Sequence, residues 1–341
     1  MSTVTADKIA RLSAMLDGGP RVCVLSHTNP DGDAAGSSTA VRRYLASRGI
    51  EATVVLPGEL AGNLKFIVDP ECTVYASSEP GKAEALVTGC DLLICTDFNK
   101  PSRVDSLEGA LRRSPARKVL IDHHQEPDTE LFDLWFSETE ISSASELVYQ
   151  VLRALEASRP DGGPLTEPCA RALMCGMTTD TNNFANSVYP STLAMASDLL
   201  SLGVDRDAII EAIYNSGREN RLRITGYILS EKLHIEGDTA WMILRREEIE
   251  HFGIREGELE GLVNIPLTVK EVTASIFLRE DEGGYFRVSI RSKKGRSALA
   301  IAKTWYGGGG HEQAAGGKLR WPSQISSPEG AEAYVKEHLS E

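Results

Sequence analysis

The feature that most constrains the fold is an alternation of short apolar runs with helix-like segments through the first two-thirds of the chain. Strands that alternate with helices form parallel sheets whose crossover helices cover both faces. The sequence therefore predicts an α/β fold, with a doubly wound domain around a mainly parallel sheet. The strand candidates are RVCVLS, EATVVL, DLLICT and RKVLI, and apolar residues recur at helical spacing in residues 37–48, 105–113, 142–155 and 190–202.

The pattern changes after residue 215. A polar stretch opens a predicted connecting helix, and the segments TAWMIL, EVTASIFL and YFRVSIR then indicate strands. The segment EDEGGYF, between the last two, is typical of a hairpin turn in which glycine adopts a positive φ. We expect a first domain over residues 1–215, a connecting helix over 216–236 and a smaller mixed α/β domain over 237–341.

Composition limits the classes of partner. The net charge of −13 argues against a protein that coats long duplex nucleic acid, because such proteins need a broad basic surface. The sequence contains no run of about 18 apolar residues, the length needed to cross a bilayer. Its first residues lack the basic segment followed by an apolar segment that is typical of an export signal. We therefore expect a cytoplasmic protein that does not bind membranes. A homodimer is expected only because dimers are the commonest soluble oligomers.

Acidic and imidazole side chains directly follow three of the predicted strands. Ligands of open parallel sheets bind beyond the carboxyl ends of the strands, so these side chains are expected to meet. Each segment alone is equally typical of a helix cap or a turn. Together they combine carboxylate with imidazole, a ligand set that suits manganese and similar divalent ions. The residues are His27, Asp31, Asp33, Asp97, Asp122, His123 and His124.

A fourth segment, Gly176-Met-Thr-Thr-Asp180, follows the helix-like run ARALMC and alone indicates only a capped helix end. In order, however, His-x-x-Pro-Asp-x-Asp-Ala, a strand-end Asp, Asp-His-His and Gly-x-x-x-Asp-Thr resemble the DHH phosphoesterase family. The tail Gly307-Gly-Gly-Gly-His311-Glu-Gln-Ala-Ala-Gly-Gly resembles the glycine-rich motif of that family's associated carboxyl-terminal domain, as found in stand-alone nanoRNase/pAp phosphatases. The resemblance spans most of the chain.

The resemblance implies a centre of two Mn²⁺ ions. One ion would be held by His27, Asp31 and Asp97, and the other by Asp33, Asp97, His123 and Asp180. Asp122 would orient neighbouring groups, and His124 would contact the scissile phosphate. Asn182 stands where many relatives have glycine, which affects the local loop and not the ligand Asp180.

The second predicted domain supplies local positive charge. Residues 283–311 contain six basic residues and no acidic one, and some of these belong to a solvated hairpin face. Arg291 lies at the end of a predicted strand, and the resemblance places it with His311 against the substrate's phosphate or terminal base. The backbone of Gly308, Gly309 and Gly310 would approach that group closely, although a flexible linker is the alternative interpretation.

The resemblance implies hydrolysis of short oligoribonucleotides to nucleoside 5′-monophosphates and, as a second activity, of pAp to AMP and phosphate. Relatives that act on linear or cyclic dinucleotides, pyrophosphate or single-stranded DNA share the first-domain motifs, so a dinucleotide phosphodiesterase is the leading alternative. From a different class, a nucleotide-binding sensor that has lost catalysis would keep the fold. The presence of every expected metal ligand argues against the sensor.

Overall fold

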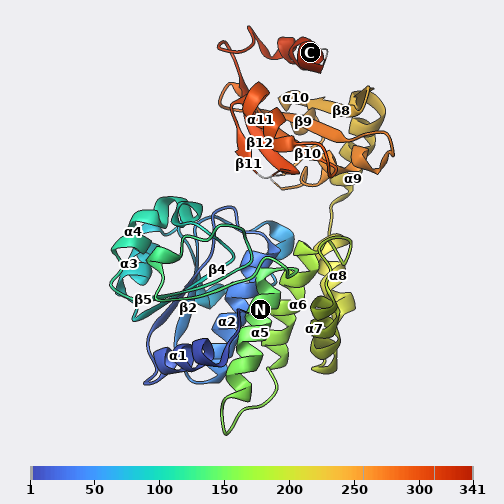
Figure 1. Cartoon of the computed structure of the whole chain (residues 1–341). Helices are drawn as coiled ribbons and strands as arrows, with labels where there is room; N and C mark the ends of the chain where they lie inside the picture. Colours follow the sequence, from blue (N-terminus) through green and yellow to red (C-terminus); the bar gives the residue numbers. More distant parts are fainter. Residues whose placement is uncertain (1–2, 256, 311, 340–341) are drawn as a thin grey trace. The chain divides into compact units, whose positions relative to one another are not determined.

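The structure, a computed structural model, describes residues 3–255, 257–310 and 312–339. The chain forms two compact units, Met1–Ser216 and Gly217–Glu341 (Figure 1). Among the described residues, no helix combines the length and apolar character that a membrane span requires.

The first unit is built on one parallel sheet with the strand order β3-β2-β1-β4-β5-β6. The predicted doubly wound α/β domain is confirmed. Its elements are α1 (Ala6–Leu16), β1 (Val22–Leu25), α2 (Gly32–Ser47), β2 (Ala52–Leu56), β3 (Thr73–Tyr75), α3 (Pro80–Gly89), β4 (Leu92–Thr96), α4 (Glu108–Arg113), β5 (Arg117–Asp122), β6 (Leu134–Ser137), α5 (Ala144–Ala157), α6 (Glu167–Asp180), α7 (Pro190–Ser201) and α8 (Arg206–Tyr214).

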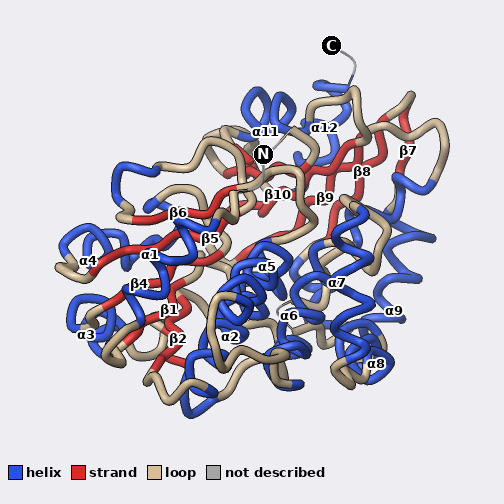
Figure 2. Tube along the Cα trace, turned by 60° about the horizontal axis from the view of Figure 1, so that its bottom comes forward, coloured by secondary structure: helices blue, strands red, loops and turns tan. Residues whose placement is uncertain are grey.

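Helices cover both faces of this sheet, because side chains alternate between the faces along each strand. On β1, Val22 and Val24 pack with α2, α5 and α6, whereas Cys23 and Leu25 pack with α3 and α4. Figure 2 shows the strands between these two layers of helices. Burial on both faces explains why the strands are continuous apolar runs in the sequence.

The four predicted strands of this unit are present as β1, β2, β4 and β5. The edge strands β3 and β6, of three and four residues, were not predicted. The helix expected over 37–48 begins earlier, at Gly32, because the Asp31 carboxylate caps it by accepting hydrogen bonds from the N–H groups of Asp33 and Ala34.

The second unit has a mixed sheet with the strand order β11-β12-β10-β9-β8-β7, in which β8 and β9 are parallel and the other neighbours antiparallel. The expected hairpin joins β9 to β10, with Gly284 at a φ of 72°. Its elements are α9 (Glu219–Tyr227), β7 (His234–Glu236), β8 (Thr239–Leu244), α10 (Arg246–His251), β9 (Ala274–Asp281), β10 (Tyr285–Ser292), α11 (Ala298–Tyr306), β11 (Gly309–Gly310), β12 (Ala314–Arg320) and α12 (Ala331–Leu339).

The two faces of this sheet differ. Ile276 and Leu278 pack on one face in a core that includes residues of α11 and α12, whereas Phe277 packs on the other face with Ile224 of α9 and with Ile228. Helix α9 therefore belongs by its packing to the second unit. The division of the chain into catalytic, connecting and substrate-binding segments at residues 215 and 236 stays a prediction.

Candidate functional site

The site residues predicted in the first unit converge at the carboxyl edge of the parallel sheet. His27 lies in the segment after β1, Asp97 directly follows β4, and Asp122 ends β5. Because β1, β4 and β5 are parallel neighbours, their carboxyl ends lie side by side. The strand order reverses between β1 and β4, which is the place where open α/β sheets bind ligands.

Asp97 lies at the centre of this cluster. Its Oδ2 lies 3.3 Å from Nε2 of His27, and its Oδ1 lies 3.4 Å from Nε2 of His123. The residue is buried and has a φ of 63°, a left-handed conformation that residues other than glycine rarely adopt. Each carboxylate oxygen thus faces a different imidazole, as expected of a ligand shared by two ions.

Two groups of side chains have the spacing of metal ligands, with ligand atoms within 4.8 Å of one another in each group. They contain the residues that the sequence assigns to the two ions, and the structure brings these residues together. A third group with the same spacing overlaps them and includes His124. The groups are His27, Asp31 and Asp97; Asp33, His123 and Asp180; and Asp97, His123 and His124.

Hydrogen bonds orient two of the imidazole rings. Nδ1 of His27 lies 2.7 Å from the carbonyl oxygen of Thr28, which can only accept, so the neutral ring keeps its proton on Nδ1 and offers Nε2 as a ligand atom. Nδ1 of His124 lies 2.8 Å from Oδ1 of the fully buried Asp122. The second Asp122 oxygen accepts from the His124 backbone N–H at 3.2 Å. Asp122 therefore fixes the orientation of His124.

The charges in this cluster are unbalanced. In the described part of the chain, ion pairs to its ligand carboxylates come only from histidines. Burial opposes protonation of His27 and His123, but the carboxylates outweigh it and raise the pKa of His27 to about 9 and that of His123 to about 10. Burial and nearby carboxylates raise the pKa of Asp33 well above its usual range. Protons thus neutralise the centre where cations are absent, and its carboxylate and imidazole donors fit divalent ions.

The close approach of helices α2 and α6 brings Asp33 of α2 beside Gly176 of α6. A Cβ added at Gly36 would lie 2.6 Å from the carbonyl oxygen of Ala172, and one at Gly176 would lie 2.0 Å from Oγ of Ser145 and 2.8 Å from Oδ1 of Asp33. Glycine is therefore required at both positions. Sequence reasoning missed this role, because a glycine inside a helix does not reveal which backbone approaches it.

The amino terminus of α5 supports Asp33. Oδ2 of Asp33 accepts a hydrogen bond of 2.7 Å from the Ala144 N–H, and Oδ1 accepts one of 2.9 Å from the Ser145 N–H. A helix amino terminus carries a partial positive charge, so these bonds hold the carboxylate in place and compensate part of its charge.

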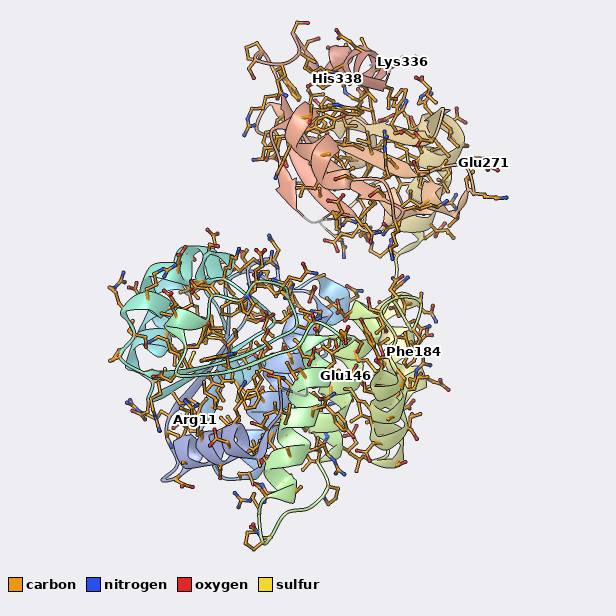
Figure 3. The ribbon with its side chains drawn as sticks, in the orientation of Figure 1. Arg11, Glu146, Phe184, Glu271, Lys336 and His338 are labelled. Carbon is orange, nitrogen blue, oxygen red and sulfur yellow. The ribbon has the colours of Figure 1, made fainter. Side chains whose placement is uncertain are left out.

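Glu146, labelled in Figure 3, is a buried residue that the sequence analysis did not single out. Its Oε2 accepts hydrogen bonds from the Ser142 N–H at 3.2 Å and from the Thr192 hydroxyl at 2.7 Å, and the Ser142 hydroxyl donates to the same oxygen. Glu146 thereby ties the segment before α5 to α7. The pattern Ser143-x-x-Glu146, a helix-start signal, could have identified it.

The chain turns sharply after Asp180, the last residue of α6. Asn182, Asn183 and Phe184 have φ values of 46°, 57° and 66°. Asn182 thus keeps the left-handed conformation that glycine would adopt, and asparagine tolerates it better than most residues. The asparagine at this position is therefore compatible with the left-handed backbone of the loop.

In the second unit, the predicted substrate residues Arg291 of β10 and Gly309 and Gly310 of β11 lie in one sheet, with β12 between the two strands. Arg291 lies opposite Ala314 of β12. Strand β12 pairs on its other side with β11. The Arg291 guanidinium donates to the carbonyl oxygen of Ile290 at 2.9 Å and has no carboxylate partner among the described residues. Burial lowers its pKa. His311 lies outside the described residues.

The glycine run has a packing role in the structure. A Cβ at Gly308 would lie 1.9 Å from the Gly316 carbonyl oxygen, and one at Gly310 would lie 2.6 Å from that of Ala314. These two glycines let β11 lie directly against β12, so the run is not a flexible linker. A Cβ at Gly309 meets no atom within 4 Å, which leaves space beside this residue.

Comparison with known proteins agrees with this architecture. Residues 21–177 match the DHH family, N-terminal domain, and residues 239–328 match the DHHA1 domain. The chain is 30% identical to the bifunctional oligoribonuclease and PAP phosphatase NrnA of Thermus thermophilus, over 94% of this chain and 91% of that protein. It is 28% identical to the cyclic-di-AMP phosphodiesterase PdeA of Listeria monocytogenes, over 91% of this chain but only 46% of PdeA.

Two solved structures share the fold. An exopolyphosphatase-related protein from Bacteroides fragilis superposes with a TM-score of 0.91 at 31% identity, covering 100% of this chain and 97% of that one. Exonuclease RecJ bound to manganese superposes with a TM-score of 0.59 at 14% identity, covering 100% and 96% of the two chains.

The substitution Gly176→Ala tests the approach of α6 to Asp33. We expect the free energy of unfolding to fall by about 1–3 kcal/mol, the usual cost of overpacking, and the affinity for Mn²⁺ to fall as well, because the new methyl group displaces Ser145 or Asp33. Denaturant unfolding and Mn²⁺ titration measure the two effects. Gly81→Ala in α3 is the control, since a Cβ there meets no atom within 4 Å. Equal Mn²⁺ affinities in the two variants would contradict this role of Gly176.

Metal binding should release protons. The pKa values of His27 and His123 are raised to about 9 and about 10, so both rings hold at pH 7 a proton that a metal ion must displace. Because the rings lose these protons as the pH rises, the apparent affinity for Mn²⁺ should increase from pH 7 toward pH 9. Calorimetric titration in buffers of different ionisation enthalpy measures the released protons. An affinity independent of pH would overturn this account of the site's electrostatics.

Proposed function

The chain belongs to the DHH family of phosphoesterases, and we propose that it hydrolyses short oligoribonucleotides to nucleoside 5′-monophosphates, and pAp to AMP and phosphate, at a centre of two Mn²⁺ ions. The similarity to NrnA across both units supports this substrate class. The observation that carries the proposal is Asp97, whose two oxygens face His27 and His123.

In this proposal His27, Asp31 and Asp97 would hold one ion, and the buried Asp33, Asp97, His123 and Asp180 would hold the other. When bound, two divalent ions lower the pKa of a water molecule and stabilise the charge that develops at phosphorus. The mixed carboxylate and imidazole donors favour manganese over magnesium or calcium, which prefer oxygen ligands alone.

The protein's own groups would orient the phosphate. Asp122 accepts from Nδ1 of His124 and holds the ring, and a protonated ring would donate from Nε2 to a phosphate oxygen. We therefore propose His124 as the catalytic residue that contacts the scissile phosphate and Asp122 as the residue that positions it. The spacing of His124 from Asp97 and His123 also suits a metal ligand, so a change of metal stoichiometry in a His124 variant would favour that role.

In the second unit, Arg291 would bind an anionic group of the substrate, together with His311 and the backbone of Gly308, Gly309 and Gly310. The missing carboxylate partner and the lowered pKa of Arg291 support this role, because a phosphate would replace the hydration that the half-buried guanidinium has lost. The open space beside Gly309 leaves room for such a ligand.

The similarity to PdeA supports a second candidate, hydrolysis of linear or cyclic dinucleotides, although the chain spans about half of that relative. A comparison of kcat/KM for 2- to 5-mer RNA, pAp, linear and cyclic dinucleotides and pyrophosphate separates the candidates. The proposal expects RNA oligomers and pAp to be the preferred substrates. A clear preference for a cyclic dinucleotide would favour the second candidate, and binding without turnover of any substrate would favour a sensor.

The substitution Asp97→Asn tests the shared ligand. We expect kcat/KM to fall by more than about 100-fold, since loss of even an outer-shell partner of a metal site costs up to about 100-fold. A chelator should abolish wild-type activity and added Mn²⁺ should restore it. Asp207→Asn, an exposed acid in the first turn of α8, removes the same charge and should keep full activity. Full activity of metal-free wild-type protein would sink the proposed mechanism.

A further inference from the structure

The sheet of the second unit carries three basic side chains side by side on neighbouring strands. Arg287 of β10 pairs directly with Arg279 of β9 on one side and with Lys318 of β12 on the other. Residues that are directly opposite share one face of a sheet. We call Arg279, Arg287 and Lys318 the cation row; neighbouring strands lie about 4.8 Å apart, so the row extends over about 10 Å.

The cation row lies on the face that is turned away from α11 and α12. Phe286 and Val288 of β10, and Leu319 of β12, belong to the core beneath these helices. Arg287 and Lys318 are each one position away from such a residue and therefore lie on the opposite face. The Arg287 side chain is 53% exposed, and Arg279 and Lys318 are partly exposed.

Little negative charge compensates this row. Like charges directly opposite one another destabilise a sheet. Among the described residues, Arg287 has one carboxylate near it, Asp281 at 3.8 Å, and neither Arg279 nor Lys318 forms an ion pair. Lys318 instead places its Nζ 4.2 Å from the centre of the Tyr285 ring, a cation–π contact that holds it on this face. An external anion would relieve the repulsion along the row.

Arg291 lies on the same face, four residues further along β10. At about 3.3 Å per residue, the two arginines are about 13 Å apart. Between them Ser289 pairs with Gly316, which has no side chain to fill the face. A stretched polyanion held at Arg291 could therefore follow β10 and reach the cation row.

We propose that the cation row binds the phosphodiester backbone of single-stranded oligoribonucleotides, beyond the group held by Arg291. This inference rests on the proposed function and names a further contact for the same substrates. With nucleotides about 3.4 Å apart along a stacked strand, a five-residue RNA spans the distance from Arg291 to the row, and pAp does not. The cation row should therefore increase the affinity for five-residue RNA and not the affinity for pAp.

The test is the triple variant Arg279→Gln, Arg287→Gln and Lys318→Gln in the full-length, Mn²⁺-loaded protein. A five-residue RNA that starts at Arg291 reaches the row with its last one or two phosphates, so the slope of log(kcat/KM) against log[salt] should fall by about 1 for this substrate. From this slope we expect a loss of about 10-fold at 0.1 M salt. The kcat/KM for pAp should stay within a factor of about 3 of the wild-type value, since pAp makes none of these contacts.

A matched control removes the same net charge elsewhere. Arg112→Gln, Arg159→Gln and Arg223→Gln change three exposed arginines outside the row, which form ion pairs with Glu108, Asp161 and Glu219. This control should keep the five-residue activity and its salt dependence, and thermal unfolding should show that both triple variants are folded. Equal losses for the five-residue RNA and pAp, or no loss for either, would overturn the inference.

A binding measurement separates failure of this inference from failure of the proposed function. Fluorescence anisotropy of a labelled five-residue RNA, in the Asp97→Asn background that should prevent cleavage, reports the cation row independently of turnover. Weaker, less salt-dependent binding by the triple variant supports the row even if the wild type hydrolyses another substrate. Binding equal to that of the Asp97→Asn parent would refute the row even if the wild type cleaves RNA.

Discussion

The mutual repulsion of aspartates at the carboxyl edge of the first sheet is the constraint on which the rest of the site depends. Asp33 and Asp97 are buried, and two carboxylates of like charge do not stay ionised in such a place unless positive charge lies between or beside them. The fold supplies part of it through His27, His123 and the amino terminus of α5. The remainder must come from protons or from bound cations, which therefore compete for the same carboxylate and imidazole groups.

That repulsion has to be resisted by rigid packing. Gly176 lets α6 approach Asp33 and Ser145 more closely than any side chain would allow, and α5 donates two backbone hydrogen bonds to the same carboxylate. Glu146 secures the start of α5 through Ser142 and connects it to α7. Helices α5 and α6, which are distant from Asp33 in the sequence, thus hold this ligand in place. A shift of either helix would change the spacing of the metal ligands.

The predictable part of this arrangement is the local part. A strand followed at once by His27, Asp97 or Asp122 is visible in the sequence, and parallel topology then brings the strand ends together. The role of Gly176 was not predictable, because it exists only once α2 and α6 are packed. Glu146 is visible in the sequence as part of a helix-start pattern, but its bond to Thr192 of α7 is not. The short edge strands β3 and β6 were also missed.

Register is a second limit of the sequence, and the cation row shows it. The absence of acids from residues 283–311 is visible in the sequence, but Arg279 and Lys318 lie outside that stretch and become neighbours of Arg287 only through the pairing of three strands. A slip of one residue would turn Arg287 into the core beneath α11 and α12 and turn Phe286 and Val288 out of it. The apolar core under α11 and α12 therefore fixes the face on which the charges appear.

A chain of net charge −13 can still bind a polyanion, because screening limits the range of the electrostatic field. At physiological ionic strength the field of an exposed charge decays over about 8 Å, which is shorter than the cation row. A phosphate on the row therefore responds to Arg279, Arg287 and Lys318, and hardly to the acids spread over the rest of the surface. A long duplex would extend beyond the row and meet that acidic surface, whereas a short single strand would not. Local basic charge within an acidic chain thus favours short anionic substrates through electrostatics, without any recognition of their bases.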